Sequence, residues 1–151
     1  MTQPRRAPGP LDLVESRVRN LLIEQADVRE RAERSKRKDD DARKALLLAV
    51  VGVKDATEAF LANARANAPD AAPTTYLGDV VDLIGRLLAA NQVEEASALG
   101  REPDGRWHRV IEVVIDDSLP VGRVATEFVK AYLWKGDLLR EGQVAVARHG
   151  E

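Results

Sequence analysis

The chain has 151 residues, of which 4% are aromatic and 32% are charged, and its formal net charge is -2. This composition gives little material for one large core and is typical of long solvated helices, so it favours a small globular part joined to an elongated element. The balanced charge gives no overall reason to expect nucleic acid or an anionic membrane as partner, and the lack of cysteine excludes disulfides and thiol chemistry.

The first ten residues are predicted to be a disordered tail. They combine Arg5 and Arg6 with three prolines, so they make neither the apolar core of a signal peptide nor an amphipathic targeting helix. No apolar run in the sequence approaches the roughly 20 residues that a helix needs to span a bilayer. We therefore expect a cytoplasmic protein without a membrane partner.

A long helix is predicted over residues 11–66, because a spacing of three and four residues is sustained for about seven heptads. At the helical rise per residue such a helix is about 80 Å long, too long to be covered by a small core. Its apolar seam should therefore pair in parallel with a second copy of the chain. The seam residues expected at this dimer interface are Leu11, Val14, Val18, Leu21, Val28, Leu46, Val53 and Phe60.

Polar residues interrupt this seam at Gln25, Ser35 and Asp39. One interpretation is that they fix the register of the helix pair at some loss of stability. The other is that this segment is the weakest part of the pair. The overlapping stretch 29–44 holds eight basic and five acidic residues, which indicates a solvated helix face supported by opposite charges three or four apart.

A linker is predicted at residues 67–74, where Pro69 and Pro73 interrupt the helical pattern. A shorter helix should follow from about Thr75 to Val93, in a helical region that extends to residue 100. Its apolar stripe has only the long helix to pack against in one chain, whereas four such segments in a dimer would close a bundle. Residues 94–105 have the character of a transition.

The periodicity changes to that of strands in the last part of the chain, and a small β-domain is predicted over residues 101–148. Residues 108–115 form one strand, residues 121–134 one long or two short strands, and residues 138–147 another. Lys135-Gly136-Asp137 is predicted to be a hairpin turn. The fold class is therefore α+β.

A series of short motifs occurs in order within this region. Asp104 and His108 are followed by Val121-Gly122-Arg123-Val124, by Lys130-Ala131-Tyr132 and by Leu139-Arg140 with Val144-Ala145-Val146. Together these motifs resemble the C-terminal β-domain of the GrpE family, the nucleotide exchange factors of DnaK-type heat-shock chaperones. The resemblance covers residues 75–147, and over the long helix it consists of heptad character alone.

The sequence also departs from the GrpE pattern at several positions. The family's Lys-Gly-Tyr has Ala131 in place of glycine, and its Arg-Pro-Ala has Glu141 and Gly142 in place of proline and alanine. Val121 stands where proline is usual, and Asp137 where a basic residue is frequent. The charge change at Asp137 implies a choice of partner that differs from that of a typical family member.

The resemblance implies a dimeric co-chaperone that promotes exchange of ADP for ATP on a DnaK-type chaperone. Such a protein is not an enzyme and needs no cofactor. It also implies that part of the basic stretch 29–44 makes side contacts with the chaperone. The residues that match chaperone-contacting positions of the family are Pro103, Gly105, Phe128, Lys130 and Val146.

The histidines and two of the glycines could have either chemical or structural roles. His108 near Asp104 would suit a catalytic pair, but no nucleophile or second base accompanies it, and the resemblance implies a structural turn. The two histidines of the chain lie far apart in sequence and give no metal-ligand pattern, so no metal site is predicted. Gly122 and Gly136 lie outside any phosphate-binding motif and indicate turns.

Two other functions remain open on the sequence. One is a coiled-coil dimer that kept the GrpE-like fold as a scaffold and presents its β-domain to some other protein. Unstimulated ADP release with intact dimerisation would favour it. The other is a nucleic-acid-binding β-barrel, which the acidic balance and the absence of aromatics in the basic stretch disfavour.

Overall fold

The computed structural model describes residues 9–67 and 72–150, so most of the predicted tail and the middle of the predicted linker lie outside the described residues. The chain has two structural units, which meet between Arg43 and Lys44. The first unit holds the N-terminal part of one helix, and the second holds the remainder of that helix, a second helix and the strands. The predicted α+β fold class is confirmed.

Helix α1 (Pro10–Asn67) is continuous through both units, as its heptad pattern predicted. Pro10 takes the first helical position, where its missing N–H and fixed φ favour helix initiation. The Gly9 backbone N–H donates to Asp12 Oδ2 at 2.9 Å, which is half of a capping box. At the other end Asn67 Nδ2 donates to the Asn63 carbonyl at 2.9 Å and satisfies one of the last orphan acceptors.

Helix α2 (Ala72–Ala90) begins three residues before the predicted start and ends three residues before the predicted end. At its end the Asn91 side-chain amide donates to the Leu87 carbonyl, which also accepts from the Asn91 backbone N–H, and so caps the last turn. Gln92 then adopts a left-handed backbone with φ of 62°, which no helix can continue. Val93, predicted as helix, is instead the first residue of a strand.

The β-domain consists of two three-stranded sheets within the described residues. One sheet has the order β1-β4-β5 and is antiparallel throughout. The other has the order β2-β6-β3, in which β6 is parallel to β2 and antiparallel to β3. The strands are β1 (Val93–Ala96), β2 (His108–Ile115), β3 (Val124–Val129), β4 (Ala131–Trp134), β5 (Asp137–Arg140) and β6 (Gly142–Arg148).

The strand predictions are partly confirmed. β2 has the predicted bounds, and the region 121–134 holds two short strands rather than one. The single strand predicted at 138–147 is wrong, because the chain leaves one sheet after Arg140 and enters the other at Gly142. Strand β1 was not predicted, since it is four residues long and its partner β4 lies almost forty residues away.

The predicted hairpin turn is confirmed between β4 and β5. Lys135 and Gly136 are its two central residues, and both have positive φ values, 53° and 84°. Two consecutive left-handed residues define the turn whose twist matches that of antiparallel strands. The Lys135 ammonium lies 4.7 Å from the Trp134 ring centroid, which offsets some of the strain of a non-glycine residue at this position.

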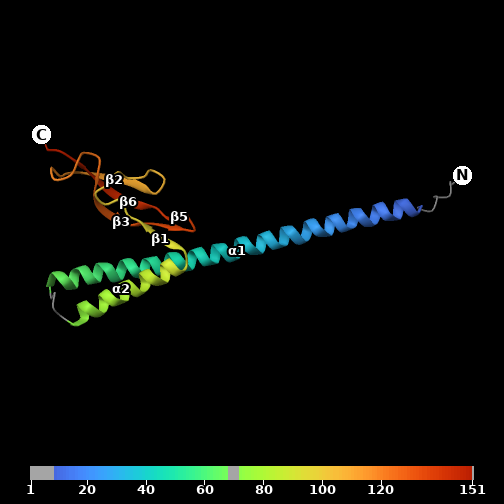
Figure 1. Cartoon of the computed structure of the whole chain (residues 1–151), viewed down its shortest axis with the longest axis horizontal. Coiled ribbons are helices and arrows are strands. Elements are labelled where there is room, and N and C mark those ends of the chain that lie inside the picture. The colour runs from blue at the N-terminus through green and yellow to red at the C-terminus, as the bar shows by residue number, and fades with distance from the viewer. Residues whose placement is uncertain (1–8, 68–71, 151) are drawn as a thin grey trace. The chain divides into compact units, whose positions relative to one another are not determined.

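The main apolar core joins the helices to the sheet β1-β4-β5. In Figure 1, α2 runs back along the C-terminal part of α1, and the strands lie over the same part of α1. This arrangement agrees with a core in which both helices contribute side chains. The buried members of the core are Leu47 and Val51 from α1, Leu88 from α2, Val93 from β1, Tyr132 from β4 and Leu139 from β5.

The departures from the GrpE pattern at Ala131 and Gly142 are explained by one contact. A Cβ added to Gly142 would lie 3.0 Å from both the Cβ and the backbone N of Ala131, and 3.0 Å from His108 Cδ2. The family pattern has glycine at the position of Ala131 and alanine at the position of Gly142. The two positions share one space, and the methyl group has moved from one strand to the other.

We expect Gly142→Ala to lower the free energy of unfolding by about 1–3 kcal/mol, because the added methyl overpacks this contact. Ala131→Gly combined with Gly142→Ala should be more stable than the sum of the single effects, with a coupling of about 1 kcal/mol. Urea denaturation followed by fluorescence of the two tryptophans, both in the β-domain, measures this. Additive single effects would show that the two positions do not share the space.

Candidate functional site

Phe128 is placed at a β-bulge near the end of β3. Its neighbours Glu127 and Val129 pair with Val144 and Gln143 of β6, so two consecutive partners on β6 face three residues on β3. A bulge redirects the extra side chain away from the regular alternation of the strand. The Phe128 side chain is accordingly 49% exposed. An exposed aromatic on a rigid strand has the properties of an interface anchor.

The other predicted contact residues lie in different surroundings. Pro103 is half-buried and Gly105 is exposed in the loop between β1 and β2. Val146 lies on the central strand β6 opposite Val124, and it packs against the smaller core of that sheet. Lys130 directs its ammonium toward α1, as described below. Among the five residues, Phe128 is the most exposed large side chain.

His108 has a structural environment. It is buried, its Nε2 donates to the Ala96 carbonyl at 2.7 Å, and its Nδ1 accepts from the Asp104 backbone N–H at 3.2 Å. The carbonyl acceptor at Nε2 requires a hydrogen on that nitrogen. Hydrogen bonds from the Arg106 side chain and backbone lower the pKa of Asp104 to about 2. The pair holds the turn that leads into β2, in agreement with the structural interpretation.

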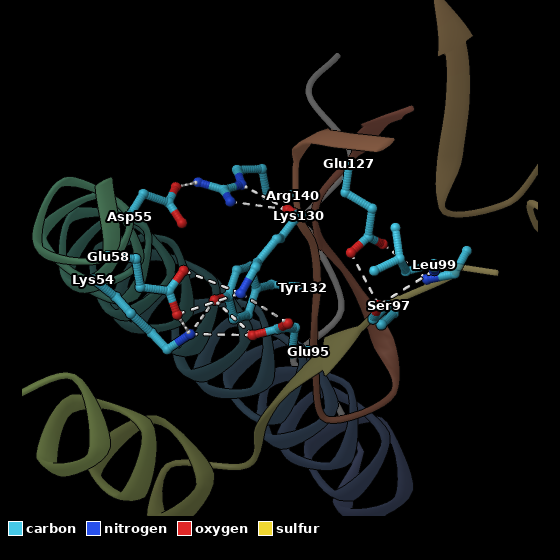
Figure 2. Close-up of polar contacts among 12 residues, drawn as sticks. Lys54, Asp55, Glu58, Glu95, Ser97, Leu99, Glu127, Lys130, Tyr132 and Arg140 are labelled. Atoms are coloured by element: carbon cyan, nitrogen blue, oxygen red, sulfur yellow. Dashed lines mark hydrogen bonds and ion pairs between the residues drawn. The ribbon is translucent and has the colours of Figure 1, made fainter. Parts of the chain in front are cut away.

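A charged cluster that the sequence analysis missed lies between α1 and the sheet β1-β4-β5 (Figure 2). The buried Lys54 ammonium donates to Glu58 Oε1 at 2.6 Å, to Glu95 Oε2 at 3.1 Å and to Tyr132 Oη at 3.1 Å. These three acceptors match the three N–H donors of an ammonium group. Lys130 Nζ lies 3.0 Å from Glu58 and 3.2 Å from Glu95, so two cations and two carboxylates neutralise each other.

Arg140 extends this cluster along α1. Its guanidinium donates twice to the Lys130 carbonyl, at 3.1 and 2.9 Å, and forms an ion pair with Asp55. It also lies 5.1 Å from the centroid of the Tyr132 ring. We call the whole set the polar junction; its members are Lys54, Asp55, Glu58, Glu95, Lys130, Tyr132 and Arg140.

The charges of the polar junction hold each other in the ionised form. Burial alone would raise the pKa values of Glu58 and Glu95, but hydrogen bonds and charges of Lys54 and Lys130 outweigh it and lower both below the ordinary 4.5. Burial alone would likewise lower the pKa of Lys54, but its three acceptors raise it above 10.5. Burial raises the pKa of Tyr132, so its hydroxyl stays protonated and donates to Glu95.

We expect the stability of the β-domain to decrease as the pH is lowered below about 4.5. A carboxylate whose pKa is lower in the folded state stabilises the fold above its unfolded pKa, and this contribution is lost as the pH falls through the folded value. The double variant Glu58→Gln, Glu95→Gln should be less stable at pH 7 but should lose less stability than the wild type between pH 6 and 3. Thermal unfolding across this range measures the difference. Parallel curves would exclude these two groups as the source.

The named seam residues of α1 are exposed among the residues that the structure describes. In the second unit the seam residues Leu46, Val53 and Phe60 are exposed. The residues of α1 that its own chain buries are Leu47, Val51, Lys54 and Leu61, which lie on a different face. In the first unit, Leu11, Val14, Val18, Leu21 and Val28 are exposed as well.

Among residues 9–67 and 72–150, no helix combines the length and the apolarity needed to cross a membrane. In the same residues no three acidic, histidine or cysteine side chains are grouped as a metal site would require. A long helix with an exposed apolar seam, packed through the polar junction against a small β-domain, is typical of proteins that act by binding other proteins.

The GrpE family model matches residues 11–148, and the chain therefore belongs to the GrpE family. The resemblance to the GrpE family that the sequence motifs indicated is confirmed. Members of this family are in general co-chaperones that act as nucleotide exchange factors rather than catalytic enzymes. No functionally curated protein matches the sequence.

Proposed function

We propose that this protein promotes ADP release from a DnaK-type chaperone, and that its β-domain makes the decisive contact. Membership of the GrpE family supports the general activity. The observation that carries the specific proposal is Phe128, an aromatic side chain that a bulge on β3 leaves half exposed. The proposed contact surface also includes Pro103 and Gly105 in the loop before β2 and the exposed parts of Lys130 and Val146.

In the proposed mechanism, the β-domain binds the chaperone more tightly when its nucleotide cleft is open. A ligand with such a preference shifts the population of the chaperone toward the open state, from which ADP leaves. Each tenfold gain in release rate requires about 1.4 kcal/mol of preference. One well-placed aromatic anchor contributes about 2 kcal/mol or more, so no catalytic side chain is needed.

The proposal includes a cytoplasmic dimer in which two copies of α1 pair in parallel along the seam. The exposure of Leu46, Val53 and Phe60, on a different face of α1 from its buried residues, supports this. Exposed apolar residues on α2, such as Tyr76 and Leu83, would enter the same bundle. Pairing would remove these side chains from water in both copies.

The test uses the DnaK-type chaperone of the same cell, loaded with a fluorescent ADP analogue. We expect the wild type to accelerate release, and Phe128→Ala to raise the half-saturating concentration roughly thirtyfold, which corresponds to about 2 kcal/mol. Ile115→Ala, which removes an exposed apolar side chain from the opposite edge strand, is the matched control and should behave like the wild type.

Equal effects of the two variants would argue against Phe128 as the anchor. A wild type that accelerates release from none of the chaperone paralogues in the cell would overturn the proposed function. The scaffold interpretation would then account for the observed architecture of helix and β-domain.

A further inference from the structure

The polar junction connects α1 to β1 and to the hairpin formed by β4 and β5, which lie in distant parts of the sequence. Lys54 and Asp55 lie one helical turn before Glu58 on α1, and Lys54 pairs with Glu95 of β1 while Asp55 pairs with Arg140 of β5. The strand β4 lies between these two and contributes Tyr132. Figure 2 shows the side chains from α1 and from the strands converging between the two elements.

The polar junction and the apolar core beneath it make different contributions. Burial of Leu47, Val51 and Leu139 favours contact between α1 and the sheet, but the hydrophobic effect is not directional and tolerates rotation or sliding. Charge-assisted hydrogen bonds require defined distances and angles. Ion pairs at both Asp55 and Glu58, which are three residues apart along α1, therefore restrict rotation of the sheet on the helix.

Arg140 is the most constrained member. Two nitrogens of its guanidinium donate to the Lys130 carbonyl, and the group also lies over the Tyr132 ring and forms an ion pair with Asp55. Lys130 directly precedes β4, and Phe128 lies two residues before Lys130. The strand β3, which carries the proposed anchor, is thus held to α1 by Lys130 just after the C-terminal end of the strand.

We propose that Asp55 and Glu58 are positioning residues for nucleotide exchange: through Arg140 and Lys130 they hold the β-domain at a fixed angle to α1. This inference rests on the proposed function. A β-domain that rotated freely would keep its contacts with one lobe of the chaperone while the cleft opened and closed. It would then bind the open and the closed chaperone with equal affinity and would not change their populations. A rigidly held domain binds the open state more tightly and therefore increases its population.

The first measurement is a distance distribution that does not depend on the chaperone. The chain has no cysteine, so Cys introduced at the exposed positions Lys44 and Val121 takes spin labels at two defined sites of the second unit. Labelled protein is diluted with unlabelled protein so that only distances within one chain contribute. We expect a narrow distribution for the otherwise wild-type chain and a broad one for Asp55→Asn, Glu58→Gln.

The second measurement is ADP release at saturating and at low concentration of the unlabelled proteins. In Asp55→Asn, Glu58→Gln we expect the maximal release rate to fall about tenfold, equivalent to about 1.4 kcal/mol of lost preference, with less than a threefold change in the half-saturating concentration. The conservative variant Asp55→Glu with Glu58 intact should recover most of the rate. Glu141→Gln, which removes an ion pair with Arg109 inside the β-domain, should leave both quantities unchanged.

Each outcome decides the inference. A narrow distance distribution in the double variant overturns the claim that these ion pairs fix the angle, and a broad distribution with an undiminished maximal rate overturns their part in exchange. A wild type without exchange activity overturns the proposed function and the exchange role together, while the distance distributions still decide whether the ion pairs hold the domain. Far-UV circular dichroism and tryptophan fluorescence verify that every variant is folded.

Discussion

Replacing Tyr132 by alanine should lower the free energy of unfolding of the β-domain by about 3–5 kcal/mol, the range for removing a buried aromatic ring. Tyr132 is only 2% exposed and lies in the core shared by α1, α2 and the strands. Its loss leaves a cavity. It also removes two hydrogen bonds, one that the buried Lys54 ammonium donates to the Tyr132 hydroxyl and one that this hydroxyl donates to Glu95. Urea denaturation followed by tryptophan fluorescence measures the change.

Two controls separate the causes. Tyr132→Phe keeps the ring and removes only the hydroxyl, so it should lower the free energy of unfolding by about 1–3 kcal/mol through the unsatisfied polar partners. Phe128→Ala removes an aromatic side chain from a half-exposed site and should change it by less than about 1 kcal/mol. If Tyr132→Ala were no worse than Phe128→Ala, the ring would not be part of the core.

The sequence was sufficient for the features that depend on local patterning. The heptad spacing predicted α1, and the run of β-branched residues predicted β2 with its observed bounds. The Lys135-Gly136 turn followed from the preference of such dipeptides for left-handed backbone. Each of these signals lies within a few residues of the structure it specifies, so no knowledge of distant contacts was required.

The polar junction could not be predicted because its members meet only in the folded chain. Lys54 is separated from Glu95 by 41 residues and from Tyr132 by 78. Lys54 and Glu58 are four apart on a helix, which is the spacing of an ion pair along one helix face. It indicated a surface ion pair of little energetic weight, whereas the structure buries the lysine under β4.

Lys130 illustrates how the junction changes the interpretation of a predicted site. From the sequence it was expected to contact the chaperone, and this stays a prediction. In the structure its side chain is 32% exposed and its ammonium lies between Glu58 and Glu95. A contact with the chaperone would have to be made without breaking these pairs, so the variant Lys130→Ala would change the junction and the interface together.

Introducing charge into the seam should abolish dimerisation, and this is the largest effect that we expect on association. The variant Val18→Asp, Leu21→Asp places two carboxylates per chain where the proposed interface buries apolar side chains. Burial of each such side chain contributes about 1.5–3 kcal/mol, so four per dimer contribute more than about 6 kcal/mol, or over four decades in Kd. Sedimentation equilibrium should find a monomer at concentrations where the wild type is a dimer.

A matched variant makes this test specific to the seam. Leu13 and Ile23 are 59% and 55% exposed and lie off the seam, whereas Val18 and Leu21 are 50% and 48% exposed and lie on it. A single chain therefore gives no reason for Leu13→Asp, Ile23→Asp to be the milder change, and only a second copy along the seam distinguishes the two pairs. The seam variant should also lose helicity, because an unpaired helix is marginally stable in water. Equal association of the two variants would refute the proposed interface.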